Sequence, residues 1–286
     1  MFGTTADYIE DLIDVKGSSI VIDSINNYIN PSFPGIKKPE PIKENLDKLS
    51  QRIKKENYAL GLAFDLDGDR VGIVDENGEI LETYQIFLLL LYYFLEHQDE
   101  RLPVVKSISV SNAISNLAAH YKVPLVETPV GFKYLSKYLM NAEAMIAGEE
   151  SGGFGFIDFK DRDGIVSSIY IIHLIIESGL SISQILESIN KITGSTYIGR
   201  KDLEFNSKNR SDLINLLKNL KANDIYDFGL SYVDEQDGIK FSYNDGSWIL
   251  IRISGTENLI RIYAESINQE TVDIMIANLI KFIDIS

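Results

Sequence analysis

The chain has 286 residues, enough for two or three domains that each bury a core. Hydrophobic residues make up 45% and charged residues 24%, which excludes wholesale disorder, and the lack of cysteine excludes disulfides, thiolate zinc sites and cysteine nucleophiles. The net charge of −15 makes most of the surface repel nucleic acid, so we expect no nucleic-acid partner, and an anionic ligand would need the few arginines gathered in one place.

The first part of the chain alternates helix and strand signals around a proline-rich loop. Four of the seven prolines fall within residues 31–41, which predicts an extended loop there. The apolar spacing predicts, in chain order, a helix at 6–16, a buried strand at 19–23, a helix at 42–56, strands at 59–64 and 71–74 leading into an Asn-Gly hairpin turn, and a helix at 83–96. We take residues 1–99 as a first α/β domain.

The longest apolar run, residues 86–95, has about half of the roughly 20 residues that a membrane span requires. No charged-then-apolar signal peptide opens the chain. We therefore expect a cytoplasmic protein without a membrane partner.

Residues 100–193 repeat the alternation and form a second expected α/β domain. Strands are predicted at 104–110, 124–127 and 144–147, with helices at 113–121, 131–141, 164–178 and 181–192. Strands separated by helices of this length predict two parallel α/β units. From residue 194 the pattern changes: strands at 196–204, 238–243, 247–253 and 259–265, with helices at 210–220 and 269–283, predict a C-terminal α+β domain, 194–286, with an antiparallel sheet.

The strand at 59–64 is followed by the acidic loop Asp65-Leu66-Asp67-Gly68-Asp69-Arg70. Three carboxylates at alternate positions repel one another unless a cation lies between them, and hard oxygen ligands of this kind suit Mg²⁺. We therefore predict that Asp65, Asp67 and Asp69 hold Mg²⁺. Arg70 would face a phosphate at the same place.

The same loop leaves a second enzyme class open. Residues 64–68 resemble the opening of the haloacid-dehalogenase-type phosphatases, in which Asp65 would be a nucleophile and Asp67 an acid. That family also requires a later lysine and a paired-acid loop after another strand, and the sequence offers no convincing pair.

Two glycine-containing loops carry the remaining candidate residues. Gly148-Glu149-Glu150-Ser151-Gly152-Gly153 follows a predicted strand, and its carboxylates and hydroxyl could bind vicinal sugar hydroxyls or form a plain exposed turn. Arg252-Ile253-Ser254-Gly255-Thr256-Glu257, with Arg261 on the next strand, offers backbone amides, two hydroxyls and two arginines for a phosphate dianion. Lys133 and Arg162 could add positive charge to these loops or be solvated surface cations.

In this order the three loops resemble those of the α-D-phosphohexomutases, the phosphoglucomutases and phosphomannomutases, from about Gly3 to the C-terminus. Residues 65–70 match the family's metal loop D-G-D-G-D-R, residues 148–152 its sugar loop G-E-x-S-G, and residues 252–261 its phosphate loop R-x-S-G-T-E-P-x-x-R. Shorter matches lie at 33–35, 39–41, 128–133 and 162–165.

The resemblance implies three related α/β domains followed by an α+β domain. It also implies the interconversion of hexose 1-phosphate and hexose 6-phosphate through a phosphoserine and a bisphosphate intermediate, with Mg²⁺ neutralising the developing charge. Arg70 and Lys133 would be supporting charges, and Glu149 and Ser151 would bind the sugar hydroxyls. The phosphate that does not react would be held by Arg252, Ser254, Gly255, Thr256 and Arg261.

The chain also departs from the family pattern. Leu66 replaces a glycine of the metal loop, Asn258 a proline of the phosphate loop, and Gly153 a histidine that some members carry. The sequence contains no T-x-S-H-N-P-type phosphoserine loop, and the resemblance implies that the opening strand of the family's second domain, which corresponds to residues 1–99 here, is missing as well. We therefore expect a first domain truncated at its N-terminus, a chain inactive on its own, and a phosphoserine supplied by a separate chain or segment.

A non-catalytic protein that binds a sugar phosphate is the alternative from another functional class. The sequence does not decide among glucose, mannose and amino-sugar phosphates. The expected small-molecule partner is a hexose phosphate in either case.

Overall fold

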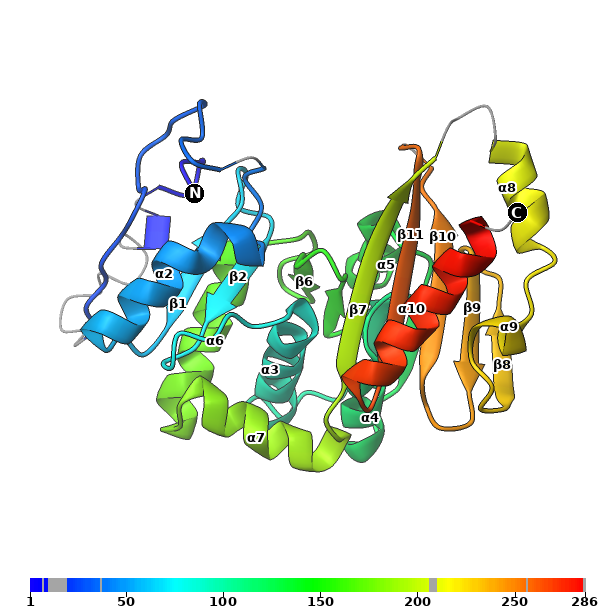
Figure 1. The fold of residues 1–286 in the computed structure, drawn as a ribbon. Helices are drawn as coiled ribbons and strands as arrows, with labels where there is room; N and C mark the ends of the chain where they lie inside the picture. The colour runs from blue at the N-terminus through cyan, green and yellow to red at the C-terminus, as the bar shows by residue number, and fades with distance from the viewer. Residues whose placement is uncertain (7, 10–19, 37, 206–209, 256, 285–286) are drawn as a thin grey trace. The chain divides into compact units, whose positions relative to one another are not determined.

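The computed structural model describes the chain except for residues 7, 10–19, 37, 206–209, 256 and 285–286. The described residues form two compact units, Met1–Thr193 and Gly194–Ser286 (Figure 1). Most of the helix predicted at 6–16 lies outside the described residues.

The first strands of the N-terminal unit form an antiparallel pair, and one helix covers this pair. Helix α2 (Lys43–Glu56) precedes β1 (Gly61–Phe64) and β2 (Val71–Val74), and Gly61 pairs with Val74. The expected parallel arrangement is wrong for these two strands. The connection between them is short, whereas a parallel pair needs a crossover of a dozen or more residues.

The buried strand predicted at 19–23 is also wrong for the residues described there. Residues 20–23 form no strand, and Val21 is 82% exposed. β-branched side chains favour extended backbone, but their strand preference depends on packing against neighbouring strands.

The hairpin turn after β2 is confirmed. Gly78 has a φ of 73°, and the Glu79 carbonyl accepts a hydrogen bond from the Asp75 amide at 2.9 Å. A positive φ is the conformation that glycine adopts without a steric penalty.

Helix α3 (Thr83–Glu96) forms the centre of the N-terminal unit. Nine of its residues are buried, and it packs against three other helices: α4 (Asn112–His120), α6 (Gly164–Ser178) and α7 (Ile182–Thr193). A helix that is apolar on all sides is expected in a core. Among the described residues no single helix is long and apolar enough to cross a membrane, and α6 and α7 pass that test only together, as a pair bent by 87°.

The second sheet of this unit has the order β4-β3-β5-β6. Its strands and remaining helix are β3 (Val104–Ser107), β4 (Leu125–Thr128), α5 (Phe132–Met140), β5 (Ile146–Gly148) and β6 (Phe154–Phe156). β3 is parallel to β4 and β5, as expected, and β6 is an additional antiparallel strand that the sequence did not indicate. Because β5 and β6 are joined directly by residues 149–153, the glycine-rich loop is a connection between neighbouring strands.

The C-terminal unit is an antiparallel sheet of order β7-β11-β10-β9-β8, which confirms the predicted α+β architecture. Its elements are β7 (Tyr197–Glu204), α8 (Arg210–Leu217), α9 (Ala222–Ile225), β8 (Leu230–Asp234), β9 (Ile239–Tyr243), β10 (Trp248–Ile253), β11 (Leu259–Ser266) and α10 (Gln269–Asp284). Helix α10, red in Figure 1, packs on β7 and β11. A Cβ on Gly199 would lie 2.5 Å from Val272 of α10, so glycine allows this close approach.

Candidate functional site

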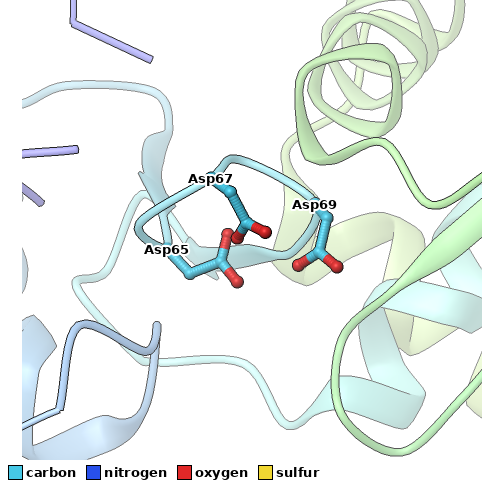
Figure 2. Close-up of side chains that lie close together, drawn as sticks. All are labelled: Asp65, Asp67 and Asp69. Atoms are coloured by element: carbon cyan, nitrogen blue, oxygen red, sulfur yellow. The ribbon is translucent and has the colours of Figure 1, made fainter. Parts of the chain in front are cut away.

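The acidic loop begins where β1 ends, and its three carboxylates face one another (Figure 2). One oxygen from each of Asp65, Asp67 and Asp69 lies within 4.8 Å of the others. Gly68, at the centre of the loop, has a φ of 77°, and a Cβ there would lie 2.3 Å from Thr5. The tight turn that brings the carboxylates together therefore requires a glycine at this position.

Protein groups compensate the charges of this loop only in part: the Nη2 of Arg162 lies 2.6 Å from the Oδ2 of Asp69, and the Arg70 amide donates to Asp65 at 3.2 Å. Burial, together with the neighbouring Asp69 and Asp67, raises the pKa of Asp65 to about 7. The Nε of Arg70 is 3.6 Å from both Asp65 and Asp69, which is too long for a good hydrogen bond. A donor set made only of oxygen atoms suits a hard cation, so these residues fit a metal ion.

The glycine-rich loop places Glu149 in a buried position immediately after β5. Its carboxylate accepts a hydrogen bond from the Gly131 backbone. Burial, helped by the nearby Glu150, raises the pKa of Glu149 to about 7, and Arg162 and Arg70 oppose this rise. The buried Ser151 hydroxyl has no hydrogen-bond partner among the described residues, so it is a donor that a ligand could use.

Backbone contacts join these two loops, although they lie about 80 residues apart in the sequence. Arg70 and Gly153 form an isolated antiparallel bridge, and the Val71 amide donates to the Gly152 carbonyl at 3.3 Å. The start of α6 is tied to the same place, since the Gly164 amide donates to the Gly68 carbonyl at 2.9 Å. The candidate metal loop and the candidate sugar loop are therefore parts of one local structure.

Other polar residues lie behind the glycine-rich loop, at the ends of β3 and β4. The Glu150 carboxylate accepts hydrogen bonds from Ser109 at 2.6 Å and from Ser107 at 3.2 Å. The ammonium of Lys106, a fully buried residue, donates to Glu127 at 2.6 Å. Lys133, predicted as a supporting charge, follows Gly131 at the start of α5, and its ammonium lies 4.8 Å from the centre of the Tyr134 ring.

The C-terminal unit brings two arginines side by side. Arg252 on β10 and Arg261 on β11 are direct cross-strand partners. Arg252 donates to Asp237 at 2.7 Å, and Arg261 donates to Glu257. These two acids compensate the like charges of the cross-strand pair, and an anionic ligand at this place would bind between the two guanidinium groups.

The turn between these strands presents small groups beside the arginines. The Ser254 amide donates to the Leu259 carbonyl at 2.8 Å, and the Ser254 hydroxyl accepts from the Glu257 amide at 3.2 Å. A Cβ on Gly255 would meet none of the described residues within 4 Å, so there is space beside the turn at this position. Thr256, which the sequence also singles out, lies outside the described residues.

The structure thus joins the acidic loop and the glycine-rich loop in the N-terminal unit and places Arg252 opposite Arg261 in the C-terminal unit. Asp237, the partner of Arg252, is missed by the sequence analysis because nothing local in the sequence pairs the two residues. Glu257 is quoted there as part of the loop but given no role, although it lies four residues before its partner Arg261. The sequence presents Arg162 only as a surface cation or an added charge, whereas the structure places its guanidinium 2.6 Å from Asp69 and 3.9 Å from Glu149. Its position in Arg162-Asp163-Gly164, just before a helix, is the only sequence signal for it.

Three family models match the chain in consecutive segments. They describe the phosphoglucomutase/phosphomannomutase α/β/α domain II at residues 1–78, the α/β/α domain III at residues 82–192 and the C-terminal domain at residues 208–280. Each matched segment contains one of the three candidate loops.

Curated relatives agree with these matches. A phosphoglucomutase/phosphomannomutase from Thermococcus kodakarensis is 30% identical over 86% of this chain and 52% of its own length. A phosphomannomutase from Methanocaldococcus jannaschii is 28% identical over 87% of this chain and 52% of its own length. The chain spans about half the length of the curated relatives it matches.

Solved structures share the fold. A protein from Thermus thermophilus, assigned as a phosphomannomutase, superposes with a TM-score of 0.83 at 26% identity, over 99% of this chain and 59% of that one. A phosphoglucomutase/phosphomannomutase family protein from Burkholderia thailandensis gives a TM-score of 0.79 at 21% identity, over 98% of this chain and 58% of that one. On the matched segments and this shared fold, the chain belongs to the phosphoglucomutase/phosphomannomutase family.

Proposed function

We propose that this chain provides the metal-binding, sugar-binding and phosphate-binding loops of a phosphohexomutase that interconverts hexose 1-phosphate and hexose 6-phosphate. One observation carries the proposal: the acidic loop 65–70 and the glycine-rich loop 148–153 are joined by the backbone bridge between Arg70 and Gly153. A cation site and a hydroxyl-binding site are thereby held next to each other, as the transfer of a phosphoryl group on a sugar requires.

The proposed roles in the N-terminal unit follow from donor chemistry. Asp65, Asp67 and Asp69 would bind Mg²⁺, which supplies electrostatic neutralisation of phosphate charge when bound. Arg70 would contact a phosphate oxygen, with Lys133 as a second supporting charge. Sugar hydroxyls would be bound by the buried Glu149 carboxylate and by the Ser151 hydroxyl, for which the described part of the chain offers no partner.

The C-terminal unit would bind a phosphate group. Arg252 and Arg261 provide the charge, and the open turn between them provides backbone amides. The residues proposed for this role are Arg252, Ser254, Gly255, Thr256 and Arg261. We further propose three domains at 1–99, 100–193 and 194–286.

The family resemblance implies a phosphoserine as phosphoryl donor. We propose that this group comes from outside these 286 residues, on a separate chain or segment, and that the chain alone does not turn over hexose phosphates. Conversion of glucose 1-phosphate to glucose 6-phosphate by the purified chain alone would contradict this part of the proposal.

The metal site is tested by calorimetric titration of the chain with MgCl₂. Asp67→Asn removes a negative charge from the cluster, so we expect the Mg²⁺ dissociation constant to rise at least about tenfold. Asp158→Asn, at an exposed aspartate outside the loop, is the matched control and should leave the constant unchanged. Equal Mg²⁺ affinity in both variants would refute the assignment of this loop.

A further inference from the structure

Arg162 lies between the two loops of the N-terminal unit: its guanidinium pairs with Asp69 of one loop and faces Glu149 of the other at a longer distance. Its Nη2 is 2.6 Å from the Oδ2 of Asp69, and its Nη1 is 3.9 Å from the Oε2 of Glu149. Its guanidinium also lies 5.6 Å from the centre of the Phe132 ring. A planar cation with several donors can hold two carboxylates at once, which an ammonium does less well.

The place that Arg162 occupies exists because residue 153 is a glycine. A Cβ on Gly153 would lie 2.4 Å from the Cδ and 3.0 Å from the Cγ of Arg162. The aliphatic part of the arginine thus lies directly over the glycine backbone. The guanidinium can therefore take its position because residue 153 has no side chain.

The guanidinium of Arg162 holds one oxygen of Asp69 and leaves the other to the acidic loop. Arg162 contacts Oδ2, whereas Oδ1 lies 3.6 Å from the Nε of Arg70, within that loop. A partner that holds one oxygen of a metal ligand fixes the orientation of the other. The Nε of Arg162 is buried and has no hydrogen-bond partner among the described residues.

We propose that Arg162 is a positioning residue that couples the metal site to the sugar site. Because one guanidinium pairs with Asp69 of the metal site and places its charge 3.9 Å from Glu149 of the sugar site, occupation of either site favours occupation of the other. This inference rests on the proposed function, because it assumes that the acidic loop binds Mg²⁺ and that the glycine-rich loop binds a hexose phosphate.

The coupling is measured by titrating the full chain with MgCl₂ in the absence and presence of saturating glucose 6-phosphate. The ratio of the two Mg²⁺ dissociation constants gives the coupling, and we expect glucose 6-phosphate to tighten Mg²⁺ binding at least about fivefold. Arg162→Gln should bring the ratio close to one and weaken Mg²⁺ binding by about tenfold. Circular dichroism shows whether the variant remains folded.

Three further variants separate coupling from a general effect of charge or packing. Lys160→Gln removes an exposed cation from the segment between β6 and α6 that also carries Arg162. This variant should keep the wild-type ratio. Arg162→Lys keeps the positive charge but loses the planar set of guanidinium donors. Its ratio of Mg²⁺ dissociation constants should therefore lie between those of the wild type and Arg162→Gln. Gly153→Ala keeps Arg162 but displaces it, and should lower the ratio as well.

A wild-type ratio retained in Arg162→Gln would overturn the inference, as would a wild-type ratio of one with both ligands bound. Either result leaves the proposed function standing. A wild-type chain that binds neither Mg²⁺ nor glucose 6-phosphate would instead refute the proposed function, and this inference with it.

Discussion

Glu149 combines burial with nearby acidic groups, and this combination sets its protonation. The residue is only 5% exposed, yet its carboxylate is close enough to Glu150 to be affected by that charge. Ser109 and Ser107 hold Glu150 by hydrogen bonds and keep it near the loop. A carboxyl group that titrates near neutral pH can both donate and accept hydrogen bonds, which suits a group that binds hydroxyls.

The raised pKa of Glu149 predicts that the stability of the folded protein depends on pH. The pKa of Glu149 is raised from 4.5 to about 7, so the folded state holds more protons than the unfolded state between these values. The contribution of Glu149 to the free energy of unfolding is therefore fully present below pH 4.5. As the pH rises toward 7, the free energy of unfolding falls by roughly 2–3 kcal/mol. Glu149→Gln should make the decline in urea-unfolding free energy over this range shallower, measured without divalent cations; the part due to Asp65, whose pKa is also raised to about 7, remains.

The matched control is Glu44→Gln, at an exposed glutamate on α2. This variant should keep the wild-type slope. If Glu149→Gln and Glu44→Gln have the same pH profile, Glu149 does not titrate in this range.

The hairpin of β10 and β11 shows how two neighbouring strands build a binding surface. Antiparallel register places Arg252 opposite Arg261, and the short turn between the strands brings Ser254 and Gly255 beside them. Asp237 and Glu257 bind the two arginines from positions before and within the hairpin. These acids compensate the like charges in the free protein.

We expect this hairpin to bind inorganic phosphate through both arginines. Arg252→Gln removes one charge-assisted contact, which is worth about 1.5–3 kcal/mol, so phosphate affinity should fall by at least about tenfold. Lys201→Gln, at an exposed cation on β7, serves as the control. Equal losses in the two variants would show a general charge effect and not a specific site.

Each of the two units has its own hydrophobic core. The core around α3 lies within the N-terminal unit, and the core of Ile249, Ile262 and Met275 lies within the C-terminal unit. The only tryptophan, Trp248, belongs to the C-terminal unit, where it is fully buried and donates to Glu265 at 2.6 Å. Its fluorescence therefore reports the unfolding of that unit.

The two ligands should therefore stabilise different unfolding transitions. A ligand that binds only the folded form raises stability by about 2.7 kcal/mol at a hundred times its dissociation constant. We expect MgCl₂ to raise the midpoint of an unfolding phase seen by circular dichroism without moving the Trp248 fluorescence transition, and phosphate to raise the Trp248 transition. The Asp67→Asn variant should lose the Mg²⁺ effect, and a Trp248 transition that shifts with Mg²⁺ would contradict the expectation.

The sequence by itself determined the family, the order of α/β and α+β parts, and the residues of the three loops. These features are local: alternating apolar patterns set the elements, and Asp65, Asp67 and Asp69 are close in space because they are close in the chain. The direction of β2 relative to β1 and the exposure of Val21 could not be predicted from local sequence. Both depend on which neighbouring strand is present. Only the tertiary structure decided that Arg162 lies over Gly153 and touches Asp69 and Glu149, because that contact joins segments brought together by the β5–β6 connection and the start of α6.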